Sequence, residues 1–127
     1  MSYTAPIRDM MFDLEHLAGL ESISKLPGFE DATPDTAAAV LEECGKFNRD
    51  VIAPLNREGD LHPSAWADGK VTTTPGFKQA FRQFVDGGWQ GLQHSAEFGG
   101  QGLPKSISAA GTEMLNSANL SFALCPL

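Results

Sequence analysis

Gly88-Trp89-Gln90-Gly91-Leu92 and Glu97-Phe98-Gly99-Gly100-Gln101-Gly102-Leu103-Pro104 belong to a glycine-rich segment that separates two helical patterns. Residues 86–105 hold six glycines in twenty positions, far above the usual share of roughly 7%. The lysine that follows, Lys105, is preceded by proline rather than by the glycine of a phosphate-binding loop. We therefore predict that these glycines serve tight turns and close backbone packing between two helices.

The segments on both sides of this loop carry apolar side chains at three- and four-residue steps, which place them on one helix face. Before the loop we predict a helix from about Pro75 that Gly87 and Gly88 end, and after it a helix capped by Ser106. The apolar positions are Phe77, Ala80, Phe81, Phe84 and Val85 in the first helix, and Ile107, Ala110, Met114, Leu115, Ala118 and Phe122 in the second.

Two more helices are predicted in the first half of the chain. One covers residues 6–18, and the other is capped by Thr33, begins at Pro34 and runs toward Gly59. Because proline lacks a backbone donor and crowds the preceding turn, we expect a kink or an early end at Pro54. Residues 59–74 are polar and turn-forming, so they predict a surface connection with room for one helical turn at residues 64–66.

This pattern predicts an all-α fold, a bundle of about four helices without a strand. At 127 residues there is room for one domain with an ordinary core. The formal net charge of −7 argues against a nucleic-acid surface, which needs clustered Lys and Arg. The start of the chain lacks the pattern of a secretory signal, and no apolar run is long enough to cross a bilayer. Cys44 and Cys125 are interpreted as reduced core thiols of a cytoplasmic protein, not as a disulfide.

Few side chains in this sequence suggest chemistry. His16, His62 and His94 are dispersed without partners at ligand spacing, so we predict no metal site. His94 lies close to Ser95 and Glu97, but neighbours in one loop seldom converge into a catalytic triad. Glu113 lies close to the apolar face of its helix, where a carboxylate either reaches solvent, the ordinary outcome, or occupies a pocket with a shifted pKa.

Three stretches of the chain resemble the acyl-CoA dehydrogenase family. Residues 3–14 resemble an extra N-terminal segment of a longer subgroup that includes the 3-methylmercaptopropionyl-CoA dehydrogenases. Residues 47–56, followed by Asp60, resemble the family's long second helix with its internal proline. The glycine loop and the helix after it complete the resemblance, which covers essentially the whole chain.

The resemblance implies an N-terminal helical extension at residues 1–32 and a family-type N-terminal helical domain at residues 33–127 that is truncated at its end. The resemblance also implies that the full enzyme binds FAD, that a glutamate removes the α proton of an acyl-CoA thioester, and that hydride passes from the β carbon to flavin N5. The segments for both roles would follow Leu127, so no catalytic or cofactor-binding residue is assigned here, and we expect the natural polypeptide to continue. Carried over by position, Glu113, Met114 and Ser117 belong to a helix that walls the acyl-chain pocket.

The resemblance also implies an acyl-CoA substrate and a homo-oligomer for the full enzyme. Two alternatives stay open. One is a stand-alone helical protein-interaction module without catalytic activity, and the other is an acyl-CoA oxidase, which shares this domain but differs in how its reduced flavin meets oxygen. Acyl-chain specificity is left open as well.

Overall fold

The computed structural model describes residues 3–126 and is mostly helical. In the first half, α1 (Ile7–Phe12), the π-helical turn η1 (Asp13–Leu17) and α2 (Leu20–Ile23) precede α3 (Pro34–Phe47), the π-helical turn η2 (Asn48–Ile52) and α4 (Pro54–Leu61). In the second half, β1 (Ala65–Ala67) and β2 (Lys70–Thr72) precede α5 (Phe77–Asp86), the 3₁₀ turns η3 (Trp89–Gly91) and η4 (Ala96–Phe98), α6 (Lys105–Ala118) and α7 (Leu120–Ala123).

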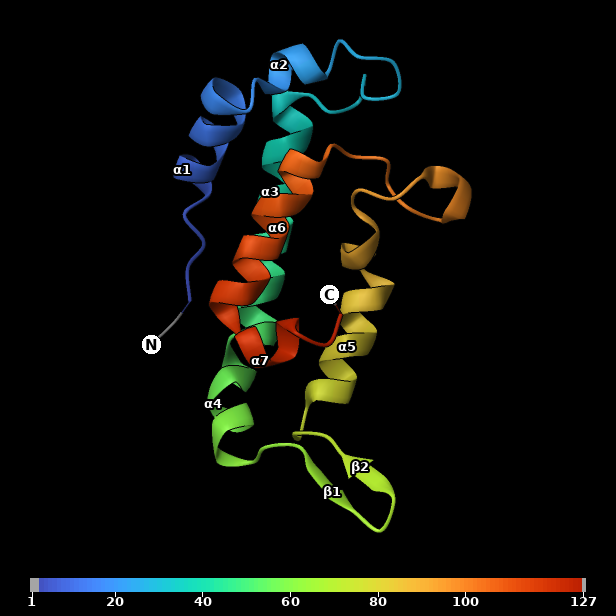
Figure 1. Cartoon of the computed structure of the whole chain (residues 1–127). Coiled ribbons are helices and arrows are strands. Elements are labelled where there is room, and N and C mark those ends of the chain that lie inside the picture. The colour runs from blue at the N-terminus through green and yellow to red at the C-terminus, as the bar shows by residue number, and fades with distance from the viewer. Residues whose placement is uncertain (1–2, 127) are drawn as a thin grey trace.

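The centre of the fold is the pair formed by α3 and α6, which run side by side (Figure 1). The N-terminal helix α1 lies along one side of this pair and α5 along the other side. One core cluster joins α1, α3 and α6 and includes the buried Leu14, Leu41 and Met114. A second cluster joins η2, α5, α6 and α7 and includes Ile52 and Phe84. The helical bundle predicted from the apolar spacing is therefore confirmed in its main lines.

The start of α3 forms as its sequence predicts. Thr33 has an extended backbone, and its side-chain oxygen accepts a hydrogen bond from the backbone N–H of Thr36 at 3.2 Å. Pro34 occupies the first helical position, where its missing N–H leaves no hydrogen bond unmade. These two residues set the beginning of the central helix.

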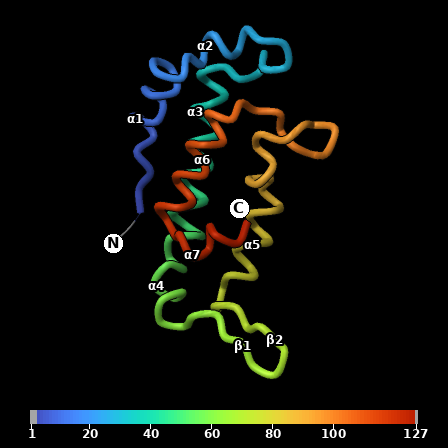
Figure 2. Tube along the Cα trace, viewed as in Figure 1, coloured from blue at the N-terminus to red at the C-terminus, as the bar shows by residue number. Residues whose placement is uncertain are grey.

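The long second helix does not end at Pro54. Its helical path passes through the proline and continues to Leu61, as the trace shows (Figure 2). The preceding turn is π-helical, and the N–H of Ala53 donates to the carbonyl of Asn48, five residues back, at 2.8 Å. This wider turn changes the hydrogen-bond spacing just before the proline, where a regular helix would crowd the ring. Of the two outcomes expected at Pro54, a kink or an early end, the early end is wrong, because the helix continues to Leu61.

The prediction that the chain has no strand is also wrong, because β1 and β2 form an antiparallel hairpin where one helical turn was expected. Trp66 lies opposite Val71 across the two strands. Asp68 and Gly69 form the turn with φ values of 49° and 76°. Positive φ at both central residues is the geometry of a type I′ hairpin turn, for which Asp-Gly is a preferred pair.

Two further details of the second half differ from the sequence-based expectations. The last long helix has Ser106 as its second residue, not as its cap, and it stops at Ala118, where Asn119 turns into extended backbone before α7. Cys125 is exposed, so it is not a core thiol, whereas Cys44 is buried as predicted. Both cysteines are free.

Candidate functional site

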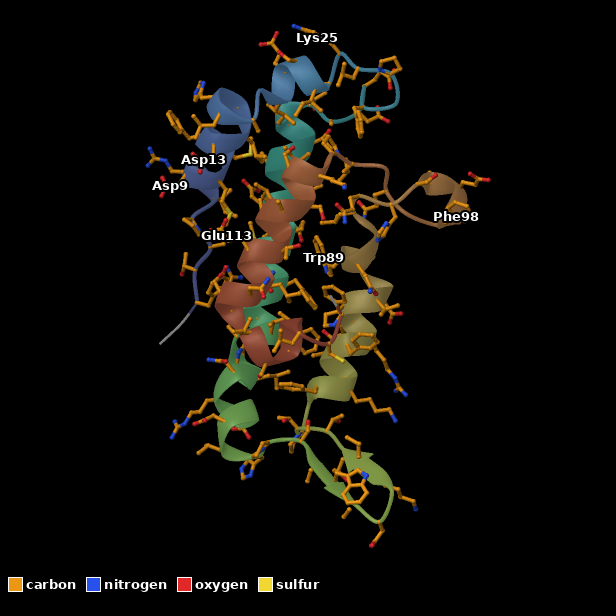
Figure 3. All side chains as sticks on the ribbon, viewed as in Figure 1. Asp9, Asp13, Lys25, Trp89, Phe98 and Glu113 are labelled. Atoms are coloured by element: carbon orange, nitrogen blue, oxygen red, sulfur yellow. The ribbon has the colours of Figure 1, made fainter. Side chains whose placement is uncertain are left out.

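A groove of about 310 Å³ lies between the N-terminal helices and α6, and Glu113 is part of its lining. The N-terminal side contributes side chains from α1, η1 and the residue that follows, and α6 contributes four positions along its first turns. The lining residues are Met10, Asp13, Leu14, Leu17, Ala18, Ser106, Ala109, Ala110 and Glu113. Figure 3 shows Glu113 on the side of α6 that faces the N-terminal segment.

The groove is left open because three of the α6 side chains that line it are small and two larger side chains of the opposite wall are buried against the core. On α6, Ser106, Ala109 and Ala110 are small and leave space beside the helix. On the opposite wall, Met10 and Leu14 are buried against the core and hold α1 and η1 in place. The groove is thus bounded by a small-residue face of α6 and by the outer edge of the N-terminal helices.

The charge of this groove is negative. Asp13 and Glu113 are both exposed and line it from opposite walls. The ion pairs found among residues 3–126 involve other acids, and they join Lys25 to Glu21, Lys46 to Glu43 and Arg49 to Asp50. A groove with an apolar floor and two carboxylates favours an uncharged or cationic guest and disfavours an anionic one.

The three residues that the resemblance placed at an acyl-chain pocket do not share one environment. Glu113 and Ser117 are one helical turn apart on the exposed side of α6. Met114 is completely buried in the cluster between α1, α3 and α6. Of the three, Glu113 lines the groove, and Met114 supports the helix from beneath.

Tyr3 joins this face of α6, although it was not among the site residues predicted from the sequence. Its hydroxyl is 3.0 Å from the Ser117 hydroxyl, which itself donates to the Met114 carbonyl at 3.1 Å. Because Ser117 has only one hydroxyl hydrogen, Tyr3 is the donor to Ser117 Oγ. Burial is the main cause that raises the pKa of Tyr3, and the charge of Glu113 acts in the same direction. The one sequence signal for this contact is the aromatic ring itself, isolated ahead of the first helix.

The glycine loop serves close packing, as predicted. A side-chain carbon on Gly100 would lie 2.1 Å from the backbone oxygen of His94, so no larger residue fits there without backbone movement. Ser95 accepts a hydrogen bond from the N–H of Glu97 at 3.2 Å and so caps the 3₁₀ turn η4. The Ser95 hydroxyl therefore has a structural role in this turn.

Within residues 3–126, no group of three His, Cys, Asp or Glu side chains is placed to hold a metal ion. In that part of the chain, no helix combines the length and apolarity needed to span a bilayer. The groove at Glu113 is the candidate site because its lining includes a residue that the sequence analysis placed at a ligand pocket.

A mostly helical chain with an apolar, negatively rimmed groove along one helix is compatible with binding of an uncharged tail. Comparison with known proteins is more specific. The chain is 48% identical over all its 127 residues to the 3-methylmercaptopropionyl-CoA dehydrogenase of Ruegeria pomeroyi. It is 28% identical over 120 residues to the broad-specificity linear acyl-CoA dehydrogenase FadE5 of Mycobacterium tuberculosis. No protein-family model matches the chain.

This chain is therefore a homologue of the acyl-CoA dehydrogenases, and the resemblance to the 3-methylmercaptopropionyl-CoA dehydrogenase subgroup is confirmed. The chain spans about a fifth of the length of both relatives, 22% of the first and 20% of the second.

Proposed function

We propose that this chain is the N-terminal helical domain of an FAD-dependent acyl-CoA dehydrogenase and that α6 contributes a wall of its acyl-chain pocket. The observation that carries the proposal is the identity of 48% across the entire chain to a dehydrogenase about five times as long. Residues 1–32 form the N-terminal extension and residues 33–127 the helical domain. The full protein would act on acyl-CoA as a homo-oligomer in the cytoplasm.

The groove at Glu113 supports the proposal that α6 forms a wall of the acyl-chain pocket. Its apolar lining suits an alkyl or thioether tail, for which few polar groups are needed. The exposed side chains of Glu113 and Ser117 mark the side of α6 that a substrate would meet. Met114 would act through packing, because its side chain is buried.

FAD does not fit this groove. The cofactor carries two phosphates, which proteins hold with cationic side chains or clustered backbone N–H groups. Asp13 and Glu113 carry negative charge, like the phosphates, and would repel them. In the proposed enzyme, these two residues therefore make no contact with the flavin.

The native gene tests this proposal. We expect the reading frame to continue past the codon for Leu127 and its full product to be purified with bound flavin. That product should reduce an artificial electron acceptor when an acyl-CoA thioester is added, whereas the 127-residue chain alone should do neither. A frame that stops at Leu127, with a folded monomeric product and no flavin, would instead favour the helical interaction module.

The wall is tested in the same full-length product. Glu113→Gln should change the ratio of kcat/KM values between thioesters with different tails while flavin content stays constant. Asp35→Asn is a matched control, because Asp35 is an exposed acid in the first turn of α3, away from the groove lining. Equal substrate ratios in the unsubstituted enzyme, Glu113→Gln and Asp35→Asn would reject α6 as the wall.

A further inference from the structure

The N-terminal segment contacts α6 at the turn that follows Glu113. Tyr3 donates from its hydroxyl to Ser117 Oγ at 3.0 Å, across 114 positions of sequence. Its ring is partly buried and packs against the cluster formed by η2, α5, α6 and α7. A ring held by both packing and a hydrogen bond has a defined position on the helix.

This contact uses both polar functions of Ser117. The serine accepts from Tyr3 and donates to the carbonyl of Met114 at 3.1 Å. The surface of α6 beyond Glu113 is therefore covered by the Tyr3 ring. The Ser117 hydroxyl is not free to bind an acyl tail. Glu113 and Ser117 are four residues apart, which is a rise of about 6 Å along the helix.

The groove and the Tyr3 ring lie one after the other along the same side of α6. The groove follows α6 from Ser106 to Glu113, and Tyr3 occupies the next turn at Ser117. A tail that lies in the groove and extends toward the C-terminal end of α6 would meet the ring of Tyr3.

We propose that Tyr3 is a specificity-determining residue of the acyl-chain pocket, which ends the groove along α6 and so limits the length of the tail that binds. This inference rests on the proposed function. It assigns a role in substrate selection to the N-terminal extension, which supplies Tyr3 and one wall of the groove. Uncharged tails that end before Ser117 are the substrate class that fits.

The test uses the full-length product of the native gene and a series of linear acyl-CoA thioesters of increasing length. Tyr3→Ala should raise the ratio of kcat/KM for long over short tails by about tenfold, the scale of one or more methylenes in an apolar pocket. Tyr3→Phe keeps the ring and should keep the ratio of the unsubstituted enzyme. Tyr3→Trp adds bulk and should shift the preference toward shorter tails.

Phe12→Ala is the matched control. Phe12 is an exposed aromatic residue of the same extension, and its ring packs on His16 at a centroid distance of 4.7 Å, not on α6. A purely structural role for Tyr3 would lower kcat/KM for all tails equally. That result, or an unchanged ratio in Tyr3→Ala and Tyr3→Trp, overturns the inference about Tyr3. The proposed function is not affected by it, provided that the unsubstituted enzyme oxidises acyl-CoA. A flavin-free product that oxidises no thioester would reject the proposed function itself, and the inference with it.

Discussion

The side-chain amide of Asn119 donates to the backbone carbonyl of Ile52 at 3.4 Å, and this bond joins the break after α6 to the π-helical turn before Pro54. The N–H of Asn56, which would serve the Ile52 carbonyl in a regular helix, donates to Ala53 instead. Asn119 is 1% exposed, and its side-chain oxygen accepts from the N–H of Phe122 at 3.1 Å. One side chain therefore caps α7 and satisfies a carbonyl that the irregular turn leaves open.

Asn119→Ala should lower the free energy of unfolding by about 2 to 3 kcal/mol, because it removes a helix cap and leaves a buried carbonyl without a donor. Chemical denaturation followed by circular dichroism measures this loss. Asn116→Ala is the control, since the amide of Asn116 makes only an exposed bond to the Thr112 carbonyl. Equal stabilities of the two variants would contradict the role assigned to Asn119.

Gly100→Ala should destabilise the glycine loop by more than about 2 kcal/mol, because the new methyl carbon would meet the backbone oxygen of His94 at 2.1 Å. Gly91→Ala is a matched substitution in the same loop. Its nearest neighbour would lie 3.5 Å away, which is ordinary contact, so its effect should be much smaller. Thermal denaturation of the two variants compares the costs, and similar shifts in Tm would reject the close approach.

The stability of the fold should decline at alkaline pH because of Cys44. Burial raises the pKa of its thiol from the usual 9.0 to about 11. A raised folded-state pKa gives stability that is complete below pH 9 and is lost as the pH rises toward 11, because the unfolded state ionises first. The loss attributable to this group is about 3 kcal/mol.

The difference between the unsubstituted chain and Cys44→Ala, measured by denaturant unfolding over that pH range, isolates this contribution. Cys125→Ser is the matched control, because it removes an exposed thiol and leaves the buried one in place. A slope that survives in Cys44→Ala would assign the alkaline loss to other groups.

The two carboxylates of the groove make a prediction about acidic substrates that depends on the proposed function. Asp13 and Glu113 should repel a thioester whose tail ends in a carboxylate, so the full enzyme should discriminate against glutaryl-CoA relative to an uncharged thioester of similar length. Glu113→Gln should reduce this discrimination by about fivefold at low ionic strength, and added salt should reduce it in the unsubstituted enzyme. Steady-state kinetics with both thioesters measures this discrimination. An equal discrimination in Glu113→Gln and in the unsubstituted enzyme would show that the tail does not bind in this groove.

Helices with strong local signals could be predicted from the sequence. Thr33 and Pro34 mark the start of α3 in both the sequence and the structure, because capping depends on neighbouring residues alone. Gly87 and Gly88 ended α5 as expected. In the hairpin, Asp68-Gly69 was an available turn signal, but each strand is only three residues long and fully exposed, so no alternation of apolar and polar residues revealed it.

The site was predictable only in part, for a similar physical reason. The spacing of α6 placed Glu113 near the edge of an apolar face, and the structure places it in a groove. The partner wall comes from the N-terminal helices, and the contact between Tyr3 and Ser117 joins the two ends of the chain. Such pairings depend on the tertiary fold, and no local pattern encodes them.

The hairpin also gives the molecule a spectroscopic property. Trp66 stands on β1 with 73% of its surface exposed, whereas Trp89 stacks on Phe47 at a centroid distance of 5.9 Å. These are the two tryptophans of the chain. In a Trp66→Phe background, fluorescence would report solely on the junction of α3, α5 and α6, and quenching by dissolved iodide would separate the opening of that junction from events at the molecular surface.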